Sequence, residues 1–171
     1  MAASEFSSLP RPEQEKLLSL LFEHSQVFLD YVLPVCQEPA QSWEELIERI
    51  RGHLRTMLKT PDDERIPGII AAHPRLGAKK VDSALSQAEQ ASLQTASARE
   101  TEQLAELNAE YERTFPGLRY VVFVAGRPRS VIMDDMRERI AKKDIEAEKR
   151  TAFDAMCDIA LDRVAGLGDK I

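Results

Sequence analysis

The sequence predicts an all-α fold: a single-domain, compact helical bundle with one short extended connector. Apolar residues recur at spacings of three and four along nearly the whole chain, which is the pattern of amphipathic helices. Only the apolar run at residues 120–124 has a β-like pattern, and one such segment cannot form a sheet alone. A length of 171 residues suits one domain that covers residues 1–171.

Three helices are predicted in the N-terminal third of the chain. The first follows Pro10 and Pro12, and the second stops at Pro34, because proline cannot continue the interior of a helix. Ser42 and Glu45 form a Ser-x-x-Glu capping box, so a third helix is expected to begin there and to continue to Pro61.

The middle of the chain is predicted to hold a short helix and a loop. The helix covers residues 62–72 and ends at His73, because Pro74 disfavours helical geometry in the residue before it. Residues 75–85 contain a glycine and a lysine pair, and they are predicted to form a loop.

Three further helix starts are predicted from capping residues. Ser86 and Glu89 form a second capping box, and Ser130 and Asp144 are expected to cap the last two helices. Gly166 is the expected end of the final helix, since glycine is the commonest residue just past a helix C-terminus.

Composition excludes several classes of protein. A net charge of −6 argues against a nucleic-acid partner, and no apolar run reaches the roughly 20 residues that span a membrane. The first ten residues lack a secretory pattern and the last four are Gly-Asp-Lys-Ile rather than a peroxisomal Ser-Lys-Leu type, so the sequence favours the cytosol. Two cysteines, Cys36 and Cys157, are predicted to be buried reduced thiols. The histidines lack metal-ligand spacing, so no metal is expected: His24, His53 and His73.

His73 is the strongest candidate for chemistry. Pro74 fixes it at the end of an apolar helix, and an ordinary pKa near ~6.5 lets the ring exchange protons around neutral pH. A histidine in this place could instead simply donate to a terminal carbonyl and gain from the helix dipole.

Other polar residues allow both functional and structural interpretations. Ser86, Glu89 and Gln90 gather a hydroxyl, a carboxylate and an amide that could bind a polar heterocycle or ureido group, although the same motif opens many helices. Arg163 lies among apolar residues and either extends to solvent or supplies a fixed cation for a carboxylate. The charged residues at 134–150 are interpreted as a solvated face.

Several short motifs occur in a defined order. They are Ala-His-Pro-Arg-Leu-Gly at 72–77, Leu-Ser-x-x-Glu-Gln at 85–90, Leu-Asn-x-x-Tyr at 107–111, the apolar run at 120–124 with Gly126 and Arg127, and the helix that carries Arg163. Together they resemble OHCU decarboxylases, which act on 2-oxo-4-hydroxy-4-carboxy-5-ureidoimidazoline. Many members have Phe-Gly-Phe-Pro-Phe before the extended segment, where this chain has Phe-Pro-Gly-Leu-Arg-Tyr.

The resemblance implies an all-α enzyme that converts this acid to (S)-allantoin in urate degradation, without a cofactor. It implies a small-molecule substrate and a homodimer, with neither nucleic acid nor membrane as a partner. His73 would be the catalytic histidine and Glu89 its acidic partner. Substrate binding would fall to the side chains or backbone of Pro74, Ser86, Gln90, Val122 and Arg163. In that set, the backbone of Val122 would contact the ring and Arg163 would pair with a substrate anion.

Two other functions remain open from the sequence. A related cofactor-free enzyme acting on another ureido or imidazoline acid would have the same pocket with a different depth or rim. A non-catalytic helical interaction module would instead scatter His73, Glu89 and Arg163 over its surface and expose an apolar groove.

Overall fold

The structure, a computed structural model, describes residues 1–77, 84–89 and 98–168, and every regular element in these ranges is a helix. The all-α prediction is therefore confirmed. The elements are η1 (Ala3–Ser8), α1 (Arg11–Phe22), α2 (Gln26–Val32), η2 (Leu33–Cys36), α3 (Trp43–Met57), α4 (Arg65–Ile70), α5 (Ala84–Glu89), α6 (Ala98–Thr114), α7 (Arg129–Lys142) and α8 (Ile145–Leu167).

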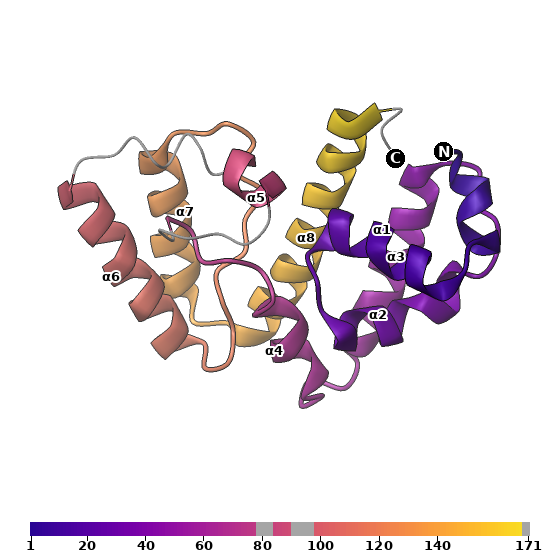
Figure 1. Cartoon of the computed structure of the whole chain (residues 1–171). Helices are drawn as coiled ribbons and strands as arrows, with labels where there is room; N and C mark the ends of the chain where they lie inside the picture. The colour runs from indigo at the N-terminus through magenta and orange to yellow at the C-terminus, as the bar shows by residue number, and fades with distance from the viewer. Residues whose placement is uncertain (78–83, 90–97, 169–171) are drawn as a thin grey trace.

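Helix α8 lies between two groups of helices (Figure 1). Helices α1, α2 and α3 form one group, and α5, α6 and α7 lie on the other side. Helix α8 packs against α1, α3 and α4, while α6 packs against α7. Phe153, Met156 and Ala160 of α8 are all buried in the core. No helix in the described ranges is long and apolar enough to cross a membrane.

Two of the predicted helix caps are confirmed. The Ser42 hydroxyl accepts a hydrogen bond of 3.1 Å from the backbone N–H of Glu45 at the start of α3. The Asp144 carboxylate accepts one of 3.1 Å from the N–H of Ala147 at the start of α8. Each side chain satisfies a backbone donor that has no partner inside its own helix.

Three other predicted helix ends are wrong by two or three residues. Ser86 lies inside α5, and Ser130 lies in the first turn of α7, where the carbonyl of Pro128 accepts from Val131 and Ile132 instead. Gly166 lies within α8, which ends at Gly168 with φ 53°. More than one residue near these ends can start or stop a helix: Pro128 lies two residues before Ser130, and Gly168 lies two residues after Gly166.

The helix predicted at residues 62–72 is shorter than expected. Helix α4 covers only Arg65–Ile70, and the chain then continues in turns that bring the N–H of His73 to 3.2 Å from the carbonyl of Ile70. Pro74 follows directly, so the backbone of His73 is held at both sides.

The extended connector at residues 120–124 is confirmed. It has no regular secondary structure, and Tyr120, Val121 and Val124 are buried. Cys36 and Cys157 are both free and buried, as predicted, and burial raises the pKa of each thiol to about 12.

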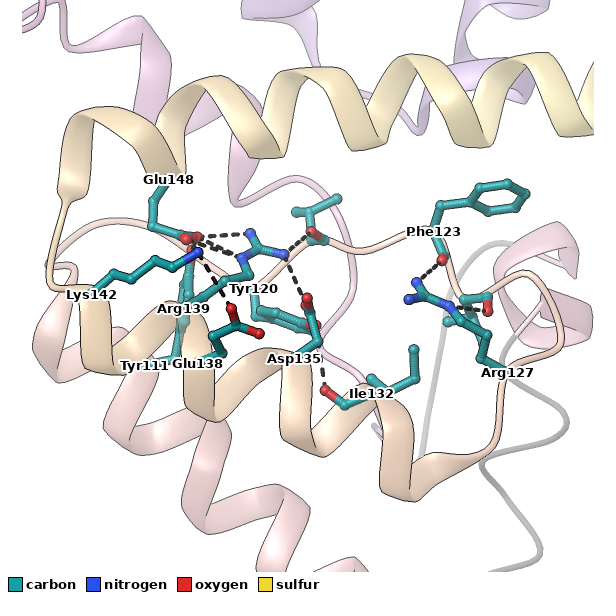
Figure 2. Close-up of polar contacts among 12 residues, drawn as sticks. Tyr111, Tyr120, Phe123, Arg127, Ile132, Asp135, Glu138, Arg139, Lys142 and Glu148 are labelled. Atoms are coloured by element: carbon teal, nitrogen blue, oxygen red, sulfur yellow. Dashed lines mark hydrogen bonds and ion pairs between the residues drawn. The ribbon is translucent and has the colours of Figure 1, made fainter.

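The interpretation of residues 134–150 as a solvated face is wrong in part. Arg139 and Glu148 are buried and face each other between α7 and α8 (Figure 2). Arg139 donates to Glu148 through Nε and Nη2, with a shortest distance of 2.7 Å, and through Nη1 to the carbonyl of Val121 at 3.2 Å. The Tyr111 hydroxyl donates to Glu148 at 2.6 Å. Charged residues can be buried when they are paired in this way, and the pairing joins segments distant in sequence.

Candidate active site

A pocket of ≈ 430 Å³ opens between the connector, α5, α8 and the segment after α4. Six of the seven predicted site residues line it: His73, Pro74, Ser86, Glu89, Val122 and Arg163. The seventh, Gln90, lies outside the described residues. Apolar side chains, among them Leu76, Val124 and Ile159, complete the wall. The size and the mixture of apolar walls with a few polar groups are typical of small-molecule sites.

His73 is buried at the pocket wall with an exposed fraction of 4%. Neither ring nitrogen has a hydrogen-bond partner within the described part of the chain, so the helix-end carbonyl is not its partner there. Burial lowers the pKa of His73 to about 4; the Glu23 carboxylate opposes this shift and the Arg163 guanidinium adds to it. The ring is therefore neutral near pH 7, with one N–H donor and one acceptor nitrogen.

Arg163 and Glu89 form an ion pair across the pocket, between α8 and α5, which lie beside each other in Figure 1. The Nε of Arg163 donates to one oxygen of Glu89 at 3.0 Å, and Nη2 donates to the other at 2.7 Å. Two parallel bonds of this kind fix both groups more firmly than a single contact. Arg163 therefore points into the protein and not to solvent.

Glu23 is a site residue that the sequence reasoning missed. It follows α1, and its carboxylate accepts hydrogen bonds from the Ser86 hydroxyl and from Nη2 of Arg163, the latter at 2.8 Å. Burial alone would raise the pKa of Glu23, but these hydrogen bonds and the charge of Arg163 bring it below the ordinary value. Nothing in the local sequence distinguishes Glu23 from the many exposed glutamates of this chain.

The backbone of Glu23 is also unusual. Its φ of 70° and ψ of 155° lie in a region that glycine adopts almost alone. The strain is retained at a residue whose carboxylate bonds to two pocket residues, Ser86 and Arg163, and strained backbone tends to occur near functional sites.

Val122 lines the same pocket. In the ranges that the structure describes, neither its N–H nor its carbonyl forms a hydrogen bond. Val122 is partly buried, and backbone groups without a protein partner bind water or a ligand, so this segment is suited to bind a polar ligand.

The described residues hold no group of three or more His, Cys, Asp or Glu side chains that could bind a metal ion. The pocket is lined by the imidazole of His73, the carboxylate of Glu89, the guanidinium of Arg163 and the hydroxyl of Ser86, and the Glu23 carboxylate bonds to the last two. Such a set can anchor an anion, orient a polar ring and move a proton.

An all-helical chain that gathers these groups around one small pocket has the properties of an enzyme for a small polar metabolite. A sequence profile of the OHCU decarboxylase family matches residues 7–165. The chain belongs to the OHCU decarboxylase family. The alternative of a non-catalytic module predicted that His73, Glu89 and Arg163 would be scattered, and the common pocket contradicts it.

Comparison with solved structures shows the same fold in a crystal structure of (S)-allantoin synthase. The TM-score is 0.65 and the sequence identity 16%, with 97% of this chain and 54% of that chain covered. This chain thus spans about half the length of that protein. Comparison with curated protein sequences gives no match.

Proposed function

We propose that this protein decarboxylates 2-oxo-4-hydroxy-4-carboxy-5-ureidoimidazoline to (S)-allantoin, with neither a metal nor an organic cofactor. The observation that carries the proposal is the buried, neutral His73 beside the Arg163–Glu89 pair in one pocket. Family membership supports the same reaction. A cytosolic location and a homodimer remain predictions.

Decarboxylation breaks the bond between the ring carbon and the carboxylate, and the electron pair stays on the ring carbon. The enzyme must stabilise that charge and then add a proton to one face. In the proposed mechanism Arg163 anchors an anionic group of the substrate, and Val122 and Ser86 orient the polar ring.

His73 and Glu89 carry the acid–base chemistry in this proposal. The neutral His73 ring can accept a hydrogen bond from the substrate hydroxyl through one nitrogen and donate through the other. Glu89 orients or polarises the reacting ring. A positioned acid–base group typically contributes about 10²–10⁴-fold to the rate.

The test uses substrate generated in situ from urate with urate oxidase and hydroxyisourate hydrolase. Circular dichroism then follows optically active allantoin as the protein is added. We expect rapid formation of (S)-allantoin, with a decrease of about 10²–10⁴-fold for His73→Asn and for Glu89→Gln.

Matched controls are His24→Asn and Glu138→Gln, since both residues are exposed and outside the pocket. Both should keep the activity of the unsubstituted protein. A folded protein that does not exceed the spontaneous racemic background would rule out the proposed reaction. Full activity and stereoselectivity in His73→Asn would rule out the role of that residue.

A further inference from the structure

The hydrogen bonds of Arg163 divide into two sets that come from different parts of the chain. The first set comes from the end of α1: Nη1 donates to the carbonyls of Leu20 and Leu21, both at 3.2 Å, and Nη2 donates to Glu23 at 2.8 Å. The second set comes from α5: Nη2 donates to Ser86 at 2.9 Å, and Nε and Nη2 donate to Glu89 at 3.0 and 2.7 Å. The guanidinium is thus held by α1 on one side and by α5 on the other.

The contacts from the end of α1 hold Arg163 in a fixed position. The last carbonyls of a helix carry partial negative charge and suit a cation. The side chains of Glu23 and Arg163 are only 10% and 3% exposed, so their contact is screened little by solvent. The strained backbone of Glu23 turns its carboxylate toward Arg163, and such strain persists only where the surroundings fix the conformation.

The Glu89 contact has the properties of an exchangeable partner. Its side chain is 26% exposed and lines the pocket. It occupies the Nε–Nη2 edge of the guanidinium, which can form two parallel hydrogen bonds with any carboxylate. A substrate carboxylate could therefore take the place of the Glu89 carboxylate without any change in the position of Arg163.

The charges require Glu89 to move if a substrate carboxylate binds to Arg163. Glu23 and Glu89 together carry two negative charges against the single positive charge of Arg163. A substrate carboxylate bound to Arg163 beside both of them would be repelled at close range by Glu23 and by Glu89. If the substrate replaces Glu89, Arg163 keeps two carboxylate partners, and Glu89 is released toward the reacting groups.

We propose, on the basis of the function proposed above, that Glu23 is a positioning residue that holds Arg163 while the substrate carboxylate replaces Glu89 on its Nε–Nη2 edge. Glu23 acts only through Arg163 and does not contact the substrate. Glu89 has two positions, paired with Arg163 in the empty pocket and turned toward the substrate in the loaded one.

A crystal structure with hydantoin-5-acetate, a stable ring carboxylate, tests the exchange directly. We expect its carboxylate on Nε and Nη2 of Arg163, Glu89 turned away, and the contact between Glu23 and Arg163 retained. Glu89 still paired with Arg163, or Glu23 displaced in its place, would overturn the proposal. This result does not depend on turnover, so it separates the exchange from the proposed reaction.

Steady-state kinetics test the role of Glu23. Glu23→Leu removes one partner that holds Arg163, and we expect KM to rise about tenfold without a fall in kcat. The contact between Arg163 and the carboxylate is strongest in the ground state, because the carboxylate loses its charge as carbon dioxide leaves. Glu23→Gln keeps an acceptor oxygen and should restore most of the affinity. Glu13→Leu, at an exposed position of α1, is the control and should change neither constant.

A merely structural role of Glu23 predicts a different result. A smaller fraction of folded protein would lower the apparent kcat and leave KM unchanged, and that outcome would overturn the positioning role. If Glu23→Leu does not fold, KM of Glu23→Gln and the crystal complex decide the question. A complex in which Arg163 keeps its α1 contacts supports the role, and one in which it loses them contradicts it.

Discussion

His73 shows how burial selects a protonation state. In water an imidazole is about half protonated near pH ~6.5. In this protein desolvation by the apolar pocket wall outweighs the nearby Glu23 charge and lowers the pKa to about 4. The residue therefore enters the reaction as a neutral ring over the whole physiological range.

The same shift predicts how folding stability depends on pH. Between about pH 4 and pH 6.5 the unfolded chain binds a proton at His73 that the folded protein does not, so the free energy of unfolding rises with pH in this window. Acidification from pH 7 to pH 4 should cost about 3 kcal/mol through this residue alone. Urea unfolding of the unsubstituted protein and of His73→Asn at both pH values gives the difference. An equal loss in both proteins would contradict the shift.

Glu23 marks the limit of residue-level prediction from sequence. Local surroundings or the family motifs distinguish His73, Glu89 and Arg163 in the sequence. Glu23 joins the cluster only because α1 packs against α8, and its strained conformation is a property of the folded chain. No pattern within a few residues of it carries that information.

At the scale of elements, a buried cluster of Arg139, Glu148 and Tyr120 holds the connector that forms part of the pocket. Arg139 of α7 bonds both Glu148 of α8 and the carbonyl of Val121, and its guanidinium lies 4.5 Å from the centre of the Tyr120 ring. Figure 2 shows these groups between the two helices. An extended segment without strand neighbours needs such side-chain bonds to satisfy its backbone.

This cluster predicts a large effect of one substitution. Arg139→Met leaves the buried Glu148 without its counter-ion and should lower the free energy of unfolding by about 3–5 kcal/mol. Arg137→Met, on the same helix, breaks an exposed pair with Asp134 and should cost about 0–1 kcal/mol. Urea unfolding measures both. Similar values for the two variants would show that Arg139 does not have the buried role described for it.

The elements themselves were largely predictable, whereas their pairing was not. Helical periodicity identified the segments, and caps such as Ser42 and Asp144 gave two starts correctly. The burial of Arg139 and Glu148 could not be predicted, because a charged run on a helix gives the same pattern whether its partner is water or another helix.

At the scale of the whole molecule, α8 joins the two groups of helices. It forms ion pairs with α3 through Arg51 and Asp158 at 2.7 Å, with α7 through Glu148, and with α5 through Arg163. The pocket is lined by α5, α8, the connector and the segment after α4. The first group takes part through Leu20, Leu21 and Glu23, which hold the pocket residue Arg163. The site therefore requires the whole fold and not one part of it.

This arrangement predicts a single cooperative unfolding transition. The one tryptophan, Trp43, lies at the start of α3 and reports on the N-terminal group, while far-ultraviolet circular dichroism reports on all helices. The two signals should give coincident urea transitions. A circular dichroism change that precedes or follows the Trp43 fluorescence change would show that α5, α6 and α7 unfold separately.

The buried thiols have a consequence for observing the molecule over time. Cys36 and Cys157 are 0% exposed and their pKa values are raised to about 12, so alkylating reagents find almost no thiolate while the chain is folded. Cys36 lies in η2, between α2 and α3, and Cys157 lies in α8. Alkylation is irreversible, so each modified thiol shows that the region around it has unfolded at least once. The rates at which the two thiols are modified therefore compare how often the two regions unfold.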